Sequence, residues 1–188
     1  MAESGVGLEN LILTVDPVDV LADGVEWHWF EEAKLSAILA KGIISPKFAK
    51  RINPEDYSTT LHNDIDEVYS LPAGEAYGDT MHKVAIAFRP RVKDEKTKYA
   101  RINKRRIPPS NFLGVVVPDD EKGFAAYAKT SAGNLIHEVL PKVQEKISST
   151  IEKMKEGGGH QIFVYGTSGK CYWPQEFSYE EILELKQK

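Results

Sequence analysis

The sequence predicts an α+β domain in which helices flank a mixed or antiparallel central sheet, and a hairpin and a helix complete the chain. Short apolar runs with strand composition cluster in the middle of the sequence and do not alternate regularly with helices. One long amphipathic helical pattern follows them, and two strand-like runs then flank a glycine-containing turn. At 188 residues, the chain is expected to form a single domain.

The stretch WHWFEEAKLSAILAKGIISP, residues 27–46, joins the first expected strand to the first expected helix. Its aromatic start, together with Val25 and Glu26, predicts the strand. The apolar residues that follow recur at helical spacing, and they are Ala33, Leu35, Ala37, Ile38 and Leu39. Gly42 stands where a helix C-cap favours glycine, and we expect Pro46 to prevent any continuation.

Four further strands are expected in the first two thirds of the chain. The runs at 83–89 and 112–117 are almost uninterrupted apolar sequences, which is typical of strands covered on both faces. Residues 67–71 predict a shorter strand, and residues 99–105 predict a fourth. The charged sequence between 91 and 98 predicts a hairpin or loop.

A long helix is expected over residues 131–155. Apolar residues recur there every four positions, which gives the helix one apolar stripe. Pro141 has no N–H to donate, so we expect it to kink the helix or to split it after Leu140. The three glycines 157–159 are expected to end the helix.

The end of the chain predicts a hairpin and a last helix. Residues 161–165 and 170–173 have strand composition and flank a glycine-containing turn. Ser178 and Glu181 then form a capping box, which predicts the start of a terminal helix. Residues 119–188 would therefore form a helical cover with an added hairpin and helix.

Composition limits the classes of site and compartment. Cys171 is the only cysteine, so an intramolecular disulfide and a cysteine-rich zinc site are excluded, and a reducing compartment is expected. The thiol itself is expected to be buried and inert. No apolar run approaches the ~20 residues of a membrane-spanning helix, and Glu3 and Glu9 stand where a signal peptide would be basic. We expect a cytoplasmic protein with no metal site and no membrane partner.

The formal charge is unevenly distributed along the chain. The total is −4, but the segment 89–106 holds nine Lys or Arg against only two acids. An acidic protein or a nucleic acid would fit this basic segment, with Tyr99 stacking on a base while the cations contact phosphates. The simpler interpretation, which we favour, is a solvated, charged edge of the sheet.

His28 is the residue whose neighbours most suggest chemistry. Trp27 and Trp29 flank it at the end of the first expected strand. In that setting, an imidazole could hydrogen-bond a ribose hydroxyl while an aromatic ring stacks on a base. A histidine that holds a backbone carbonyl is the more common arrangement.

A set of residues around this histidine resembles the opening signature of the ADP-ribosyltransferase superfamily. The matching positions are His28, Leu35, Ile38, Leu39, Gly42, Ile43, Ser45 and Pro46. The chain is similar to the DNA-targeting ADP-ribosyltransferase toxins and the RNA 2′-phosphotransferases, which continue with an aromatic-bearing strand, an apolar strand and a Pro-Pro segment. The corresponding stretches are 68–70, 84–88 and 107–117, so the resemblance spans residues 26–118.

The resemblance implies an NAD site. His28 would contact the ribose of NAD, and Tyr69 would face the nicotinamide ring. Trp29, Tyr77 and Arg101 would make further contacts to the nucleotide. The protein's main contributions to such chemistry are positioning and stabilisation of the positive charge that develops on the sugar as nicotinamide leaves.

The transferases support that charge with a glutamate, which the resemblance places on the strand before the Pro-Pro turn. Residues 98–102 there read Lys-Tyr-Ala-Arg-Ile and hold no carboxylate. An acid from another loop, Glu75 or Asp79, is therefore expected to take the catalytic position. Alternatively, Arg101 would bind a phosphate, as basic residues do in the RNA 2′-phosphotransferases.

Together these features predict an ADP-ribosyltransferase-like enzyme that binds NAD and transfers ADP-ribose to a protein or nucleic-acid target. Residues 9–118 would form its core. A bacterial toxin or an effector secreted into a host cytoplasm would belong to this class. Two alternatives stay open: a non-catalytic protein-interaction module that uses the segment 89–106 or the helix 131–155, and a nucleic-acid-binding module that uses the same basic segment.

Overall fold

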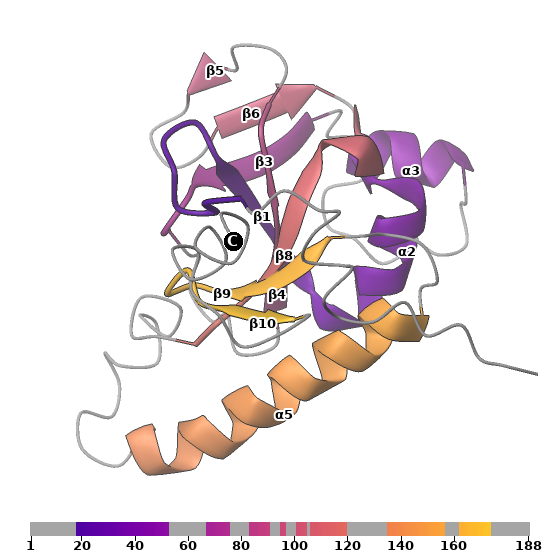
Figure 1. Ribbon diagram of the computed structural model, residues 1–188. Coiled ribbons are helices and arrows are strands. Elements are labelled where there is room, and N and C mark those ends of the chain that lie inside the picture. The colour runs from indigo at the N-terminus through magenta and orange to yellow at the C-terminus, as the bar shows by residue number, and fades with distance from the viewer. Residues whose placement is uncertain are drawn as a thin grey trace, which may run out of the picture.

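The fold is an α+β arrangement around one mostly antiparallel sheet, which confirms the predicted fold class (Figure 1). The computed structural model describes residues 18–52, 67–75, 83–90, 95–96, 101–104, 106–119, 135–156 and 162–173. The strands of the main sheet are β1 (Glu26–Glu31), β3 (Glu67–Pro72), β4 (Lys83–Phe88), β5 (Glu95–Lys96), β6 (Arg101–Lys104), β8 (Phe112–Val117), β9 (Phe163–Gly166) and β10 (Cys171–Trp173). A separate pair joins β2 (Ile43–Ile44) to β7 (Arg106–Ile107).

The sheet has eight strands in the order β10-β9-β8-β4-β1-β3-β6-β5. Every pair is antiparallel except β8 with β9, which run parallel. The helices are α2 (Leu35–Lys41), α3 (Pro46–Ile52) and α5 (Leu135–Glu156), and two single turns of 3-10 helix are η1 (Glu32–Lys34) and η2 (Pro109–Asn111). In Figure 1, β5 and β6 lie at the end of the sheet away from α5.

The predicted C-terminal hairpin is confirmed, and the structure also joins it to the central sheet. β9 and β10 pair antiparallel, and β9 continues the sheet beside β8 after the chain has crossed through α5. Gly114 makes this close contact possible, because a Cβ atom there would lie 2.7 Å from Cδ2 of the Tyr165 ring. The hairpin is therefore part of the sheet rather than an addition to it.

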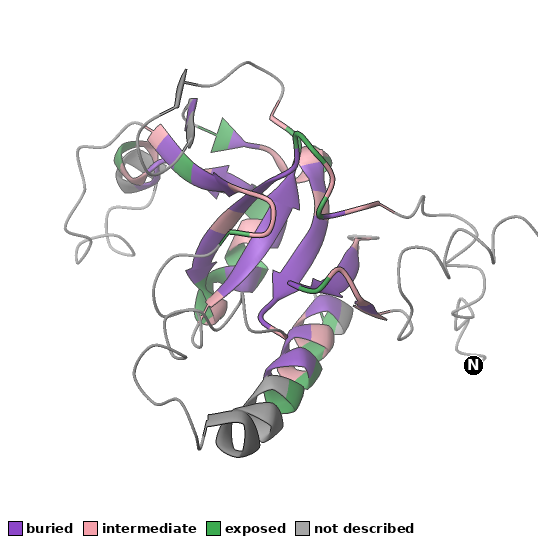
Figure 2. Cartoon of the chain, turned by 90° about the vertical axis from the view of Figure 1, so that its left-hand side faces the viewer, coloured by how far each residue is buried: buried purple, intermediate pink, exposed green. Residues whose placement is uncertain are grey.

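The two faces of the sheet carry separate apolar cores. The core on one face includes Phe30, Ile86, Val115 and Val164 of the strands, Leu35 and Leu39 of α2, and Ile147 and Met154 of α5. The core on the other face includes Trp27, Trp29, Ala85, Ala87, Val116, Phe163 and Tyr165, with Val20 and Val25 from the segment before β1. Figure 2 shows buried residues concentrated in the strands and on one side of α5.

Two predicted details of the first helix require correction, its start and its buried stripe, whereas it does end before Pro46. The helix after β1 begins later than expected, because Glu32–Lys34 form a 3-10 turn with three residues per turn. Ala33 and Ala37 consequently face solvent, and Leu35 and Leu39 form the buried stripe. Pro46 opens α3, with its missing N–H in the first turn, where none is needed. The Ser45 hydroxyl caps that helix by accepting a hydrogen bond from the Phe48 N–H at 3.4 Å.

Pro141 does not split the long helix, which runs unbroken over Leu135–Glu156. A proline removes a single N–H donor, and the helical bonds on either side of it are still made. Packing of Ile147, Ile151 and Met154 against the sheet supplies the rest of the stability. The glycines 157–159 and the expected terminal helix lie outside the described residues.

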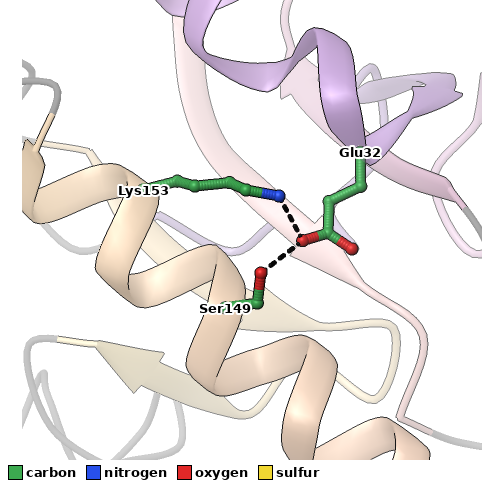
Figure 3. A network of polar contacts seen from close by, with 3 residues as sticks. All are labelled: Glu32, Ser149 and Lys153. Carbon is green, nitrogen blue, oxygen red and sulfur yellow. Dashed lines mark hydrogen bonds and ion pairs between the residues drawn. The ribbon is translucent and has the colours of Figure 1, made fainter.

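α5 is attached to η1, the turn that precedes α2, through a partly buried polar contact (Figure 3). Glu32 Oε1 accepts hydrogen bonds from Ser149 Oγ and from Lys153 Nζ, each at 2.7 Å. Partial burial raises the pKa of Glu32, but the hydrogen bonds from Lys153 and Ser149 and the positive charges of Lys153 and Lys146 outweigh it, so the pKa lies below the ordinary 4.5. The contact therefore favours the ionised acid.

The exit from α2 is packed tightly against the turn that precedes β8. Gly42 has φ +86°, and a Cβ atom there would lie 2.4 Å from the carbonyl oxygen of Ile107. Arg106 Nη2 donates to the Lys41 carbonyl at 2.9 Å, which satisfies one of the last carbonyls of the helix. Two sequence segments about 65 residues apart are thus held against each other by a glycine and an arginine.

Gly42→Ala is expected to lower the free energy of unfolding by about 3 kcal/mol, because the left-handed backbone and the clash with Ile107 add together. Gly24→Ala is the matched control, since Gly24 has φ +80° with open space around its Cα. The control should lose only about 1–2 kcal/mol, the cost of the backbone conformation alone. Chemical denaturation of both variants measures the difference, and equal losses would contradict the packing argument.

Lys153→Met is expected to make the protein's stability less dependent on pH in acid. A carboxyl whose pKa is lowered by folding contributes stability above its ordinary value, and that contribution is lost as the pH falls below 4.5 towards the folded pKa. Removing Lys153 should cost about 0.5–1 kcal/mol at pH 7 and flatten the decline below pH 4.5, because the pair is partly solvated.

Thermal denaturation between pH 3 and pH 7 measures the effect of Lys153→Met. Lys47→Met, which removes an exposed lysine of α3, serves as the control and should follow the wild-type curve. A Lys153→Met protein with the wild-type pH dependence would show that Glu32 gains nothing from this contact.

Candidate functional site

β1 and β3 are neighbours in the sheet, but they pair over only a short stretch. β1 pairs with β4 along its whole length, from Glu26 to Glu31. Its pairing with β3 consists of Glu26 with Pro72 and Trp27 with Leu71. Beyond that point, residues 67–70 of β3 pair with β6 alone. The two central strands therefore separate at His28, and we call this place the strand separation.

His28 bridges the strand separation with its side chain. Nδ1 lies 2.6 Å from the carbonyl oxygen of Tyr69. Because a carbonyl oxygen can only accept, Nδ1 must carry the proton and donate it. In the neutral imidazole, Nε2 is then left with a lone pair. The resulting group is a hydrogen-bond acceptor of fixed orientation, held at the point where the ladder ends.

The surroundings keep this imidazole neutral. Desolvation lowers the pKa of His28 below its ordinary 6.5, and the charge of Lys34 lowers it further, while the hydrogen bond to Tyr69 opposes both effects. The ring also stacks on Phe30, with ring centroids 6.1 Å apart and the planes 21° apart. A neutral ring with a fixed tautomer can accept a proton or a hydrogen bond from a hydroxyl group.

A buried carboxylate stands beside His28 on β1. Glu26 is 1% exposed, and its Oε2 accepts a short hydrogen bond from Ser70 Oγ. Asn103 Nδ2 donates to Ser70 Oγ at 2.7 Å and to Glu26 Oε2 at 3.4 Å. These three side chains, from β1, β3 and β6, form what we call the Glu26 cluster.

The sequence analysis missed the Glu26 cluster. Its one visible signal is a glutamate in the mainly apolar and aromatic run from Val25 to Phe30, where a strand covered on both faces should hold no acid. Nothing in the sequence links that glutamate to Ser70 or Asn103, which lie 44 and 77 residues further along the chain.

Three other predicted site residues, Trp29, Glu75 and Tyr69, make contacts that differ from the expected ones. Trp29, expected to contact a nucleotide, is 9% exposed, and its Nε1 donates to the backbone carbonyl of Glu75 at 3.0 Å. The Glu75 side chain, expected to be catalytic, is exposed. Tyr69 is 37% exposed, and its hydroxyl donates to Glu67 Oε2 at 3.3 Å.

Register separates the side chains of His28 and Tyr69. Trp27 and Leu71 are paired and pack in the same core, so their side chains share one face. His28 follows Trp27 by one residue and therefore points to the other face, whereas Tyr69 precedes Leu71 by two residues and stays on the first. His28 and Tyr69 thus meet through the tyrosine carbonyl and not through its ring.

Several predicted residues cannot be placed at the site. Tyr77 and Asp79 lie outside the described residues, and Arg101 is described only as a backbone position in β6. Cys171 is fully buried, and its burial raises the pKa of the thiol to about 12, in agreement with the predicted inert cysteine. Within the described ranges, His, Cys, Asp and Glu form no group of three or more suited to a metal ion.

No family model, curated protein or solved structure matches this chain. The described part of the chain contains no helix that is long and apolar enough to span a membrane. The geometry of the strand separation is therefore the evidence from which a function can be argued.

His28 is expected to titrate below pH 6.5 and to hold its proton on Nδ1 when neutral. Nitrogen-15 NMR of histidine-labelled protein distinguishes the two tautomers directly, and the spectrum of His28→Asn identifies the signal. Since the folded state disfavours the charged ring, folding stability should also decline as the pH falls below 6.5. A signal that titrates above 6.5, or an Nε2-protonated tautomer, would contradict the assignment.

Proposed function

We propose that this chain is a nucleotide-binding domain of the ADP-ribosyltransferase type, which binds NAD or an ADP-ribose-like nucleotide beside His28. The observation that carries the proposal is the neutral imidazole at the strand separation, with Nδ1 bonded to the Tyr69 carbonyl. It leaves Nε2 as an oriented acceptor for a ribose hydroxyl, which is the role that the resemblance gives to this residue.

The arrangement of the surrounding elements supports the same proposal. The residues that carry the resemblance lie on connected elements: β1 holds His28, α2 ends at the Gly42 position, and the Pro-Pro turn packs against that glycine. A scaffold of paired strands holds the acceptor rigidly, and rigid placement is what this kind of group transfer requires. Transfer of ADP-ribose to a protein or nucleic-acid target remains part of the proposal.

The role of Tyr69 in this proposal differs from the expected one. Its carbonyl positions His28, and its exposed ring, on the other face of the sheet, stays available for contacts there. Trp29 acts as an anchor for the turn at Glu75 instead of a partner for the base. The proposal therefore rests on His28 and not on the aromatic residues.

No observation favours the interaction modules over this proposal. Most side chains of the basic segment 89–106 lie outside the described residues. Within that segment, Arg106 already caps α2. Binding of an acidic protein or a nucleic acid through the segment stays a prediction.

Calorimetric titration with NAD tests the proposal on wild type, His28→Ala and His28→Asn. Asparagine offers an amide N–H near the position of Nδ1 and no counterpart to Nε2, so it separates the two roles of the ring. We expect His28→Asn to keep near-wild-type thermal stability and to raise the Kd for NAD at least 10-fold, which corresponds to about 1.4 kcal/mol. His28→Ala should lose both stability and affinity.

The pH dependence of binding is a second readout. Only the neutral ring has the Nε2 lone pair, so affinity for NAD should weaken as the pH falls below 6.5. A wild-type protein that binds no NAD at millimolar concentration, or a His28→Asn variant with wild-type affinity, would refute the proposal.

A further inference from the structure

β8 and β9 run parallel, and the loops that follow them meet at one edge of the sheet. The last residues paired between them are Val117 and Gly166, and the Thr167 N–H then donates to the Val117 carbonyl at 2.9 Å. Asp119 follows β8 by two residues, and Thr167 and Ser168 follow β9 directly. In α/β sheets, ligands bind outside the carboxyl ends of parallel strands. This edge therefore has the position of a ligand site.

Four hydrogen-bond donors converge there on one carboxylate. They come from the β9–β10 hairpin and are Thr167 Oγ1 at 3.0 Å, Ser168 N at 2.8 Å, Ser168 Oγ at 2.5 Å and Tyr172 Oη at 2.9 Å from an oxygen of Asp119. We call these four donors the Asp119 cradle. Gly166 lies beneath the carboxylate, since a Cβ atom there would collide with Asp119 Oδ2.

The Asp119 cradle suits an anion better than a metal ion. All four groups direct a proton at the carboxylate, whereas a metal ion would need oxygen lone pairs. Lys170 brings a positive charge to the same hairpin, with its Nζ 5.4 Å from the centroid of the Tyr172 ring. Backbone N–H groups, hydroxyls and a lysine are the donors with which loops bind phosphate. Because Asp119 is half-buried and Ser168 is exposed, part of the cradle faces solvent.

We propose that the Asp119 cradle binds the phosphate group of a small phosphomonoester, and that Asp119 occupies the cradle when no ligand is bound. A phosphomonoester has three acceptor oxygens and close to two negative charges. It can therefore accept from the same donors and attract Lys170 more strongly than one carboxylate does. Binding turns the Asp119 side chain out to solvent. This inference does not depend on NAD binding at His28, which lies between β1 and β3.

Asp119 acts in this proposal as a competitor that is tethered to its own site. A group on a short tether has an effective concentration of about 1 mM or more, so phosphate at lower concentration displaces it poorly. Wild type should therefore bind phosphate weakly. Removal of the carboxylate should lower the Kd for phosphate by about 10-fold or more.

Asp119→Ala is the direct test, with inorganic phosphate and methyl phosphate as probes and calorimetry as the measurement. Both probes should bind about 10-fold more tightly, or better, than they bind to wild type. Asp23→Ala is the matched control, because it removes an exposed acid and the same charge outside the cradle. It should bind both probes as weakly as wild type does.

Thermal stability is a second readout of the same variants. Asp119→Ala removes the contact between the end of β8 and the hairpin, so its Tm should fall. Phosphate at about ten times its Kd should raise that Tm by about 3–6 °C. Sodium chloride at the same ionic strength should not, and the same phosphate concentration should raise the wild-type Tm less, because the carboxylate already fills the cradle.

Tyr172→Phe separates a built site from a general attraction to Lys170. Added to Asp119→Ala, it removes one donor and keeps a ring that packs against the core. The double variant should bind phosphate about 10-fold more weakly than Asp119→Ala, which is the effect of one hydrogen bond to a charged group. If Asp119→Ala fails to fold, Asp119→Asn takes its place, because the amide keeps the shape and removes the charge. It should likewise bind phosphate more tightly than wild type.

Three results would overturn the inference. The first is equal phosphate affinity in wild type, Asp23→Ala and the Asp119 variant, and the second is an affinity that Tyr172→Phe leaves unchanged. The third is a wild type that binds no phosphate at about 50 mM, well above the effective concentration of the tethered acid, since Asp119 would then never leave the cradle. His28→Asn should bind phosphate as wild type does, so none of these results bears on the proposed NAD site.

Discussion

The hydrogen bond from His28 to the Tyr69 carbonyl joins two central strands after their own ladder has ended. β1 pairs with β4 over its full length and β3 pairs with β6 over residues 67–70, whereas β1 and β3 pair with each other at only two positions. Side chains then replace backbone bonds across the strand separation. His28 satisfies one carbonyl of β3, and Glu26 reaches the Ser70 hydroxyl. This constraint places a neutral imidazole and a buried acid at the same point in the sheet.

The rest of the fold holds those strands in place from both faces. Trp27 and Trp29 share an edge-to-face contact on one face, and their N–H groups anchor the backbone at Val20 and Glu75. A second anchor lies beyond β8, where the Asp119 carboxylate accepts four hydrogen bonds from the β9–β10 hairpin. The donors are Thr167 Oγ1 at 3.0 Å, Ser168 N at 2.8 Å, Ser168 Oγ at 2.5 Å and Tyr172 Oη at 2.9 Å. The bond of the Trp27 N–H is buried, whereas the Asp119 bonds are partly buried or exposed.

Sequence reasoning succeeded where one local property dominates. The apolar runs of β4 and β8 admit few other structures, and the four-residue spacing in α5 predicts a helix that packing then completes. It failed where neighbouring effects compete, as at Ala33, where a 3-10 turn shifts the helical phase, and of the two alternatives that it left open at Pro141 the split does not occur. His28 was visible as a candidate because its aromatic neighbours are adjacent in sequence. The sequence analysis expected the acid at Glu75 or Asp79, which stand in a loop. It did not consider Glu26, because the sequence gives no information about which acid is buried.

By itself, the sequence determined the fold class and the main strands, because periodicity, glycine positions and composition act over a few residues, and it identified His28 as a candidate. Tertiary structure alone decided which atoms His28 uses, which face Tyr69 occupies and which acid is buried. Those properties depend on register between distant segments, and a shift of one residue would turn every side chain of a strand to the opposite face. Ser70 and Asn103 become partners of Glu26 only once β1, β3 and β6 are aligned side by side.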